Sequence, residues 1–258
     1  MQLPLKQRLK LVRQDILAAL KLNGNVPVAI EETDGTVFIL VEGRRIAVPS
    51  PLRWKLYRWG WRARLDRLER EYGVGRHVTL GPDSVVLDVG ANVGEFAHVC
   101  ARYGTRAHCI EPDPTAHVCL LRNIEGLTGV AAYDDAIWKE DGEIDFGLAP
   151  ERADSSAFVR SGPVVKKRAV TLERFARDNG ISRIDLVKCD AEGAEPEVLE
   201  GAGALFDRIG VFALDTGAER NGARTNRECA EILAARGFAV IEDKIGTRCM
   251  TYGINPRR

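Results

Sequence analysis

Long apolar segments are missing from this sequence of 258 residues. No uninterrupted run reaches the roughly 18 apolar residues that a membrane-spanning helix needs. The first 20 residues break their apolar positions with charge every few residues, so they lack the apolar region of a secretory signal peptide. The six cysteines include no Cys-x-x-Cys pair, which predicts reduced thiols instead of a zinc site or a disulfide framework. We therefore expect a cytoplasmic protein with no integral membrane segment.

An excess of one charge sign is also missing, because 37 basic side chains balance 37 acidic ones. The chain as a whole therefore gives no reason to expect a nucleic-acid partner. The distribution is uneven: residues 1–80 hold 15 basic and 8 acidic side chains, whereas residues 81–258 hold 22 and 29. This asymmetry predicts an N-terminal extension over residues 1–80, used for substrate or dimer contacts, and a second domain over residues 81–258.

Local patterns divide the extension into helix, β-hairpin and helix. Apolar residues recur at helical spacing from Leu5 to Leu20, which predicts a helix over about residues 5–21 with basic residues on its other face. Two β-rich runs follow and are broken at Thr33-Asp34-Gly35, which indicates a hairpin, with a further turn at Glu42-Gly43. A second helix is expected from about Pro51 to Tyr72.

An aromatic stripe runs along this second helix among seven arginine and lysine residues. Its members are Trp54, Tyr57, Trp61, Leu65, Leu68 and Tyr72. The stripe could stack on a sugar while arginines hold acidic groups, or it could simply pack into the core, and the spacing favours packing. Trp59 lies off the stripe and is the better candidate for an exposed contact. Peripheral contact with an anionic membrane and a homodimer face made by the N-terminal helices remain open.

From Ser84 onward, short apolar runs alternate with helical patterns. This alternation predicts an α/β fold with a Rossmann-like parallel sheet and helices on both of its faces. Ligands of such sheets bind beyond the carboxyl ends of the strands. The residues at those strand ends are therefore the candidates for function.

The first strand end carries a glycine loop, DVGANVGE at residues 88–95. Gly90 and Gly94 allow a tight turn close to a ligand at a helix N-terminus. The loop is not a dinucleotide fingerprint, because Asn92 and Glu95 stand where that pattern has its second and third glycines, and no G-x-x-x-x-G-K-[ST] phosphate loop is present. Asp88 and Glu95 would repel a pyrophosphate and would suit a ligand with an ammonium group.

Carboxylates also follow the next two strands. Glu111 lies 19 residues after Asn92, close to the offset of about 20 at which a carboxylate meets a ribose diol. Asp135 and Ala136 end the third strand, where an adenine would lie, although an aspartate there is usually a turn former. The ordered series Asp88, Glu111 and Asp135 favours a ligand that combines an amino acid, a ribose, a base and a positive sulfur. S-adenosylmethionine meets all of these requirements.

The densest group of charges follows the fourth strand, in the run DLVKCDAEGAE at residues 185–195. Strand alternation puts Lys188, Asp190 and Glu192 on one side if the strand extends that far. Two interpretations stay open, a catalytic cluster and a structural network of salt bridges around Lys188. The fifth strand adds Asp215.

These segments together resemble the FkbM family of S-adenosylmethionine-dependent methyltransferases. The resemblance rests on VVLDVGANVGEF, IEPDP, TLERF and IDLVKCDAEGAEPEVLEGA, and it spans about residues 64–215. It implies a class I methyltransferase fold with a seven-stranded, mostly parallel sheet, and methyl transfer to a hydroxyl oxygen with S-adenosylhomocysteine as product. The expected cofactor contacts are Asp88, Gly90, Asn92, Gly94, Glu95, Glu111, Pro112, Asp135, Ala136 and Asp190. One departure is Asp215, where family members more often carry Glu.

Such a transfer is an in-line displacement, so the protein must align the hydroxyl with the sulfonium methyl and remove a proton. The four histidines fall within expected helices, in mid-strand or outside the core, which leaves a carboxylate or a neutral lysine as base. Asp190 is the first choice and Lys188 the second, with Glu192 or Asp215 orienting the hydroxyl. A metal-assisted variant would place Mg²⁺ on Asp190, Glu192 and Asp215.

The expected acceptor is a sugar hydroxyl of a bacterial glycan, glycolipid or glycosylated metabolite. The alternatives are a polyketide hydroxyl and a protein that binds S-adenosylmethionine without catalysis. Residues 138–170 are longer than a plain crossover and contain a predicted hairpin near Asp141-Gly142 and a polar stretch at Asp154-Ser155-Ser156. We expect part of this segment to cover the substrate.

Overall fold

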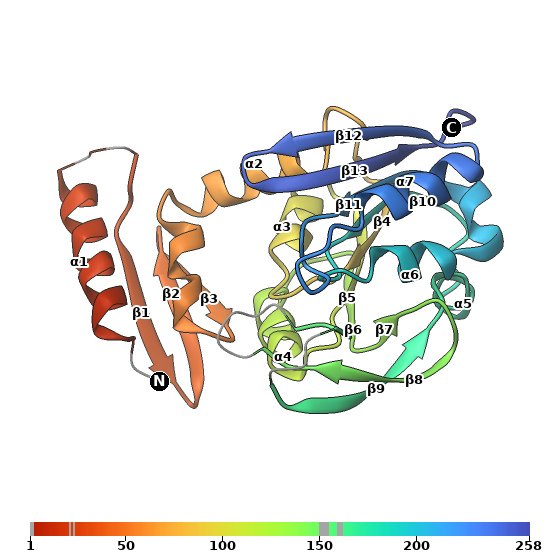
Figure 1. Ribbon diagram of the computed structural model, residues 1–258. Helices are drawn as coiled ribbons and strands as arrows, with labels where there is room; N and C mark the ends of the chain where they lie inside the picture. The colour runs from red at the N-terminus through yellow and green to blue at the C-terminus, as the bar shows by residue number, and fades with distance from the viewer. Residues whose placement is uncertain (1–2, 21, 23, 150–154, 159–161) are drawn as a thin grey trace.

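A computed structural model describes residues 3–20, 22, 24–149, 155–158 and 162–258. Its main feature is a seven-stranded sheet in the order β12-β13-β11-β10-β4-β5-β6 (Figure 1). These strands are β4 (Val85–Val89), β5 (Arg106–Ile110), β6 (Val130–Tyr133), β10 (Ile184–Cys189), β11 (Ile209–Asp215), β12 (Ala239–Ile245) and β13 (Arg248–Ile254). β13 alone in this sheet runs against its neighbours, so the predicted mostly parallel α/β sheet is confirmed.

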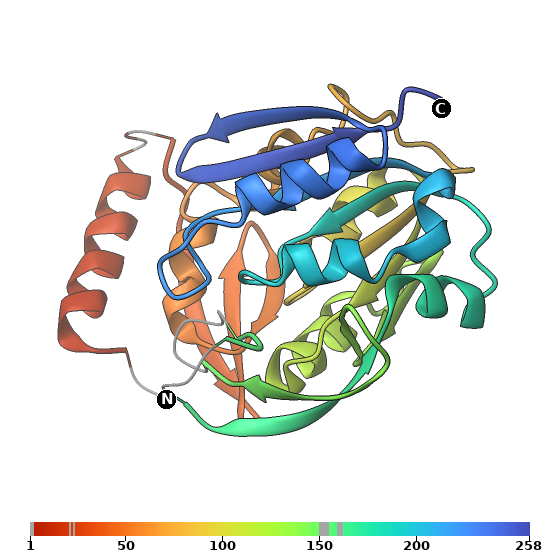
Figure 2. The same cartoon turned by 45° about the vertical axis from the view of Figure 1, so that its right-hand side comes forward.

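Helices cover both faces of the sheet, as the alternation predicted (Figure 2). Val86 and Leu186 face one buried cluster, with α3 (Glu95–Arg102) and α4 (Pro114–Asn123). Their neighbours Leu87 and Val187 face a second buried cluster. That cluster receives side chains from α5 (Leu172–Asp178), α6 (Glu195–Glu200), the 3-10 helix η2 (Gly203–Arg208) and α7 (Asn226–Ala235). The central strands are therefore apolar on both sides, as a sheet covered twice requires.

The N-terminal extension forms α1 (Leu5–Ala19) and an antiparallel sheet of three strands, β1 (Val28–Thr33), β2 (Thr36–Val41) and β3 (Arg44–Val48). This sheet packs into the same buried cluster as β4 and α3. Asn123 of α4 fastens the contact, because its side chain exchanges two hydrogen bonds with the backbone of Ala47, at 2.8 and 2.9 Å. The extension and the main sheet thus share one core.

The predicted second helix is two helices, the 3-10 helix η1 (Pro51–Tyr57) and α2 (Trp61–Glu71). The break lies at Gly60, whose φ of +95° is not helical. There the carboxylate of Glu42 accepts a hydrogen bond from the amide of Trp61 at 2.8 Å and satisfies the start of α2. The prediction of a single helix was wrong. The hydrogen bond that starts α2 comes from Glu42, which lies in a turn far from Gly60 in the sequence, so the local pattern did not reveal the break.

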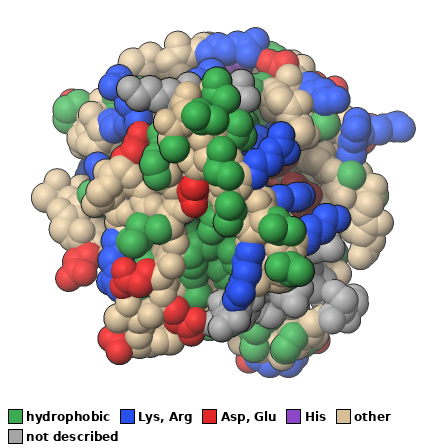
Figure 3. Space-filling view, turned by 90° about the vertical axis from the view of Figure 1, so that its left-hand side faces the viewer, with side chains coloured by type: hydrophobic (Ala, Val, Ile, Leu, Met, Phe, Trp, Pro, Cys, Tyr) green, Lys and Arg blue, Asp and Glu red, His purple; other side chains and the backbone are tan. Residues whose placement is uncertain are grey.

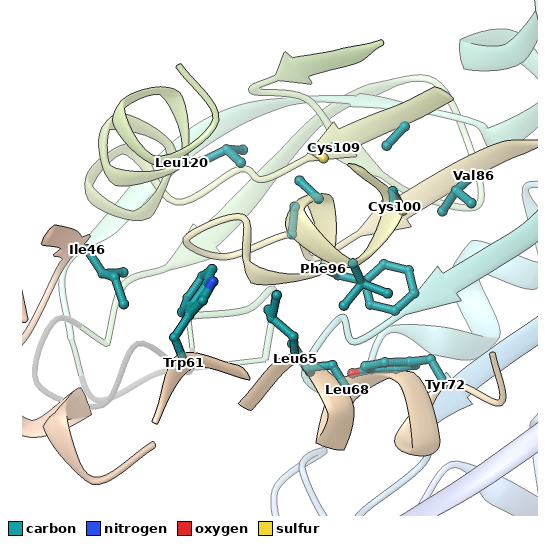
Figure 4. Close-up of a cluster of buried hydrophobic side chains, with 14 of the residues drawn as sticks. Ile46, Trp61, Leu65, Leu68, Tyr72, Val86, Phe96, Cys100, Cys109 and Leu120 are labelled. Atoms are coloured by element: carbon teal, nitrogen blue, oxygen red, sulfur yellow. The ribbon is translucent and has the colours of Figure 1, made fainter. Parts of the chain in front are cut away.

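The aromatic stripe is buried in spite of this break, so the packing interpretation is confirmed. Figure 4 shows Trp61, Leu65 and Leu68 of α2, followed by Tyr72, pointing into the cluster that contains Phe96. Trp59, which lies off the stripe, is 41% exposed and has the Arg58 guanidinium 3.8 Å from its ring centre.

The apolar face of α1 points away from the protein. We call its side chains the α1 stripe: Leu5, Leu9, Val12, Ile16 and Leu20. They are 54–73% exposed, and Figure 3 shows hydrophobic side chains in a row on this face of the molecule. The side of α1 that faces the protein is partly polar: Gln14 is buried and donates to the carbonyls of Val26 and Arg58 at 3.0 and 2.8 Å.

The segment between the third and fourth sheet strands forms a second small sheet of β7 (Ala136–Ile137), β8 (Gly142–Gly147) and β9 (Val164–Val170), in the order β7-β9-β8. The hairpin is therefore made by β8 and β9, and Asp141-Gly142 only leads into β8. Asp154 of the predicted polar stretch lies outside the described residues, whereas Ser155 and Ser156 are described. Among the described helices, none is long and apolar enough to cross a membrane.

Candidate active site

The glycine loop after β4 lies against the end of β10. Gly90 has a φ of +72°, and a Cβ atom there would come within 1.9 Å of the Asp190 carbonyl oxygen. A glycine at this position is therefore required for the two strand ends to meet. The parallel register pairs Lys188 with Asp88, so the loop and the charged run at residues 185–195 belong to one site.

A first cavity opens at this point between the ends of β4, β5 and β10. The predicted cofactor contacts that line it are Gly90, Asn92, Glu111, Pro112, Ala136 and Asp190. Apolar side chains, including Trp138 and Phe146, complete its wall, and Ser155 and Ala157 lie on it too. Part of the segment 138–170 thus covers this cavity.

Glu111 is the charged anchor of the first cavity. Its two carboxylate oxygens accept hydrogen bonds from the amides of Asn92 and Asp113, at 2.7 and 2.8 Å. Burial raises the pKa of Glu111 to about 7. A fixed carboxylate with further lone pairs beside an apolar wall fits a ribose diol next to a base.

Four predicted cofactor contacts do not line the first cavity in the described structure: Asp88, Gly94, Glu95 and Asp135. Asp88 is fully buried inside β4, and the Lys188 ammonium lies 2.7 Å from its Oδ1. Glu95 lines a second cavity and accepts two hydrogen bonds from Arg64, at 2.8 and 2.7 Å. Both carboxylates are thus paired with cations of the protein, which weakens their attraction for an ammonium group.

The other two predicted contacts, Gly94 and Asp135, lie against other residues of the protein. Gly94 precedes α3 with a φ of +83°, and a Cβ atom there would press on Leu120 at 2.6 Å. Asp135 lies 3.4 Å from the Arg168 guanidinium. Its neighbour Ala136, rather than Asp135 itself, reaches the cavity wall.

The second cavity has a volume of about 640 Å³ and lies between the extension and the main sheet. Its wall includes Gln7 of α1, side chains of η1 and α2, and the start of α3. The two cavities share four lining residues: Gly90, Asn92, Asp190 and Glu192. A group held in one cavity can therefore meet a group held in the other at this boundary.

The neighbours of Lys188 favour its charged form. Its ammonium donates to the Gly90 carbonyl at 2.6 Å and lies beside Asp88. Burial alone would lower the pKa of Lys188, but the charges of Asp88 and Asp190 raise it above its ordinary value. These contacts do not favour a neutral lysine base; the hydrogen bond from Lys188 to the Gly90 carbonyl holds the glycine loop in place.

Asp190 stands at the boundary between the cavities. Its Oδ2 accepts hydrogen bonds from the Tyr72 hydroxyl at 2.8 Å and from Arg248 at 2.7 Å. Its Oδ1 is buried and has no hydrogen-bond partner among the described residues. Burial opposes ionisation, but the charges of Arg248 and Lys188 outweigh it and hold the pKa of Asp190 well below its ordinary value. Asp190 is thus an ionised acceptor with one oxygen available.

Behind Asp190 lies a cluster of Asp215, Glu219 and Arg248. One ligand atom each from Asp190, Asp215 and Glu219 lie within 4.8 Å of one another. Burial and the charge of Asp190 raise the pKa of Asp215 to about 6, and burial with both aspartates raises that of Glu219 to about 9. The Arg248 guanidinium bonds to both aspartates and supplies the counter-charge.

These residues do not fit the expected magnesium site. Glu192 is not in the cluster, Glu219 takes its place, and Arg248 already pairs with two of the three carboxylates of the cluster. No local sequence pattern linked Tyr72 or Arg248 to Asp190. A lone arginine in the apolar run RCMTYGI was the one available signal.

Known proteins resemble this chain over the region just described. The methyltransferase FkbM domain model matches residues 88–240. Similar proteins include the 2-O-methyltransferase NoeI of Sinorhizobium fredii, 27% identical over 46% of this chain and 58% of that protein. The hexuronic acid methyltransferase AglP of Haloferax volcanii is 28% identical over 46% of this chain and 50% of its own length. The 31-O-demethyl-FK506 methyltransferase FkbM of Streptomyces tacrolimicus is 27% identical over 66% and 78%.

The match to NoeI thus spans less than two thirds of that protein's length. The family model, in contrast, covers more than half of this chain, from the glycine loop to β12. It includes the strand ends that build the first cavity and Asp190. The chain therefore belongs to the FkbM family of methyltransferases.

Proposed function

We propose that this chain transfers a methyl group from S-adenosylmethionine to a hydroxyl of a sugar. The observation that carries the proposal is the boundary at Gly90, Asn92, Asp190 and Glu192, where the first cavity, with Glu111 beside an apolar wall, meets the large and more polar second cavity. Two substrates held in these cavities would meet at a carboxylate. This is the arrangement that a direct transfer requires.

The first cavity would hold the cofactor, whose sulfonium supplies an activated methyl group. Glu111 would accept hydrogen bonds from the ribose, and the wall around Pro112 and Ala136 would pack on the adenine. Gly90 and Asn92 would hold the methionine part of the cofactor, and Asp190 lines the same cavity. Lys188 keeps this backbone fixed through its bond to the Gly90 carbonyl.

Asp190 would position the acceptor hydroxyl through Oδ1 and take its proton. The acceptor oxygen forms a bond to the methyl carbon as the carbon–sulfur bond breaks, so the oxygen becomes positive and its proton strongly acidic. A carboxylate with a low pKa is a sufficient base for such a proton. Tyr72 and Arg248 hold the other oxygen, so the carboxylate keeps one orientation.

The second cavity favours a sugar over a polyketide acceptor. Its wall includes Gln7, Arg53, Lys55 and Glu192, whereas an aliphatic polyketide would call for a dry apolar wall. Polar groups that converge on one cavity match the many hydroxyls of a sugar. The hexuronic acid acceptor in the name of AglP is consistent with this class.

Asp190→Asn tests the proposal. Methyl transfer is measured by mass spectrometry on three acceptors: a neutral methyl glycoside, a methyl glucuronide and an aliphatic macrolide alcohol. We expect Asp190→Asn to lower transfer to a sugar by about 10²-fold or more while S-adenosylhomocysteine still binds. The matched control is Asp207→Asn, because Asp207 is 74% exposed and distant from the site.

Two outcomes would contradict the proposal. Methylation of the macrolide alone would favour the polyketide alternative. Tight binding of S-adenosylhomocysteine with no transfer to any acceptor would favour a binding protein without catalysis.

A further inference from the structure

The second cavity is rich in cations. Its basic lining residues are Arg53, Lys55, Arg64, Arg67, Lys188 and Arg248. Four of these are matched by carboxylates of the protein: Arg64 by Glu95, Arg67 by Glu71, Lys188 by Asp88, and Arg248 by Asp190 and Asp215. The other two, Arg53 and Lys55, both come from η1, and Arg53 only shares Glu95 with Arg64.

Arg53 has hydrogen-bonding capacity left over. Its guanidinium reaches Glu95 only at 3.5 Å, and that carboxylate is already held by two shorter bonds from Arg64. The side chain is only 12% exposed, and its Nε is buried without a partner among the described residues. A buried N–H group without an acceptor costs free energy, so a ligand that accepts a hydrogen bond from Arg53 would remove this cost.

Lys55 and the Gln7 amide also have hydrogen-bonding capacity left for a ligand in the second cavity. Lys55 makes no ion pair among those of the described residues, although it is partly buried on the same wall. The Oε1 of Gln7 is buried, has no hydrogen-bond partner among the described residues, and belongs to a lining residue too. One wall thus offers two cations and an amide to a single ligand.

We propose that Arg53 and Lys55 bind an anionic group on the acceptor, so that the substrate is a hydroxyl compound carrying a carboxylate, sulfate or phosphate. This inference rests on the proposed function, because it assigns the second cavity to the acceptor. Arginine recognises such groups with a planar fork, and the neighbouring lysine adds a point charge. Gln7 would hold a neutral hydroxyl of the same molecule.

The test compares the double variant Arg53→Gln/Lys55→Gln with the control Arg62→Gln, whose side chain is 88% exposed on α2. The acceptors are a methyl glucuronide, a sugar phosphate and a neutral methyl glycoside. We expect the double variant to raise KM for one of the anionic acceptors at least tenfold, to leave KM for the glycoside within twofold, and to leave kcat nearly unchanged. Which anionic acceptor responds identifies the anionic group.

Binding measurements separate this inference from the proposed function. In the presence of S-adenosylhomocysteine, calorimetry should show tenfold weaker binding of the anionic acceptor to the double variant, whether or not methylation occurs. The affinity for S-adenosylhomocysteine itself should not change. Weaker cofactor binding would assign the two cations to the methionine carboxylate and overturn the inference, as would equal effects on neutral and anionic acceptors.

An independent observation concerns the α1 stripe. Its five large apolar side chains lie on one side of the helix, and the side that faces the protein contains Gln14 and Ala18. Figure 3 shows a row of hydrophobic side chains on the face of the molecule where α1 lies. Exposed apolar rows of this length mark contact surfaces, because burying them removes apolar area from water.

The charges beside the stripe indicate what covers it. Lys6, Lys10 and Arg13 lie along one edge, are exposed, and form no ion pair among those of the described residues. The opposite edge carries Arg8 and Asp15. Two antiparallel copies of α1 would bring the Lys6, Lys10 and Arg13 edges together, and their like charges would repel, which disfavours an antiparallel pair of α1 helices.

We propose that α1 lies in the interface of an anionic lipid bilayer, with the stripe among the acyl chains and Lys6, Lys10 and Arg13 on the headgroups. An amphipathic helix of this composition binds through apolar burial and attraction to anionic lipids together. The second cavity, which Gln7 of α1 helps to line, would then lie close to the membrane surface.

Vesicle co-sedimentation of the full chain tests this proposal. We expect binding to vesicles of phosphatidylcholine with phosphatidylglycerol and at least tenfold weaker binding to phosphatidylcholine alone. Leu9→Asp/Ile16→Asp and Lys6→Glu/Lys10→Glu/Arg13→Glu should each reduce binding tenfold or more and leave S-adenosylhomocysteine binding intact. Arg227→Glu, on the 89% exposed Arg227 of α7, is the control. A lack of vesicle binding, or a dimer in sedimentation that Leu9→Asp/Ile16→Asp abolishes, would overturn it.

Discussion

Arg248 decides the charge state of the site at the scale of single residues. Its guanidinium bonds to Asp190 and Asp215 and lies 3.5 Å from Glu71. Without it, three neighbouring carboxylates lose their shared cation. We expect Arg248→Met to destabilise the fold by about 3 kcal/mol, because removing one partner leaves buried charges unpaired.

Urea denaturation measures this loss. Arg257→Met is the control, since Arg257 pairs with Asp207 on the surface and both are more than half exposed. Equal, small effects of the two substitutions would show that Arg248 does not hold the cluster together.

We expect Glu111 to make cofactor binding depend on pH. Its pKa is raised by burial to about 7, and its ionised form offers more acceptor lone pairs to a ribose than its protonated form. The ionised fraction rises from about one tenth at pH 6 to about nine tenths at pH 8, so affinity for S-adenosylhomocysteine should rise about tenfold over this interval.

Calorimetry at the two pH values checks this expectation. Glu111→Gln, which cannot titrate, should bind more weakly and lose most of the pH dependence. An unchanged pH dependence in Glu111→Gln would assign the effect to another group, such as Glu195, whose pKa is also about 7 because of burial.

At the scale of elements, a helix or a helix break could be predicted from the sequence only where the residues that determine it lie close together in the chain. Periodicity predicted α1 and the helices after β4 and β5, because helical spacing is local. The break between η1 and α2 was not predictable. Glu42 accepts the hydrogen bond from the Trp61 amide at the start of α2, and it lies in a turn 19 positions earlier. Periodicity also could not tell that the α1 stripe faces solvent.

The break at Gly60 provides a test at this scale. Alanine there must adopt a φ of +95° and displace the Glu42 carboxylate, which would lie 2.6 Å from the new Cβ atom. Gly60→Ala should therefore destabilise the protein by about 2 kcal/mol, from backbone strain and a weakened helix start.

Gly237→Ala is the matched control, because its φ is +82° and no atom lies within 4 Å of a Cβ there. It should cost about 1 kcal/mol from strain alone. If thermal unfolding gave equal losses for both variants, the Glu42 contact would not contribute.

At the scale of the whole molecule, the strand-end rule brought much of the candidate site to one cavity. Six of the predicted cofactor contacts line one cavity because parallel strands of one sheet end at the same edge. Asp88 and Glu95 do not line this cavity, and their charges are paired with Lys188 from another strand and with Arg64 from the extension. Such pairings depend on tertiary contacts that no local pattern records.

The shared core predicts that the extension and the main sheet unfold together. Ile39 of β2 and Val86 of β4 belong to one buried cluster, and Asn123 ties β3 to α4. Native-state hydrogen exchange should therefore give amides of β2 and β4 nearly the same opening free energy. Much faster exchange throughout β2 would show that residues 1–80 are a separate unit.

The central claim is that the first cavity holds S-adenosylmethionine through Glu111. Calorimetric titration with S-adenosylhomocysteine, and with NAD as comparison, tests it most directly. The account predicts that S-adenosylhomocysteine binds to the protein, that Glu111→Ala abolishes this binding, and that NAD does not bind. Binding of NAD, or undiminished binding of S-adenosylhomocysteine to Glu111→Ala, would contradict it.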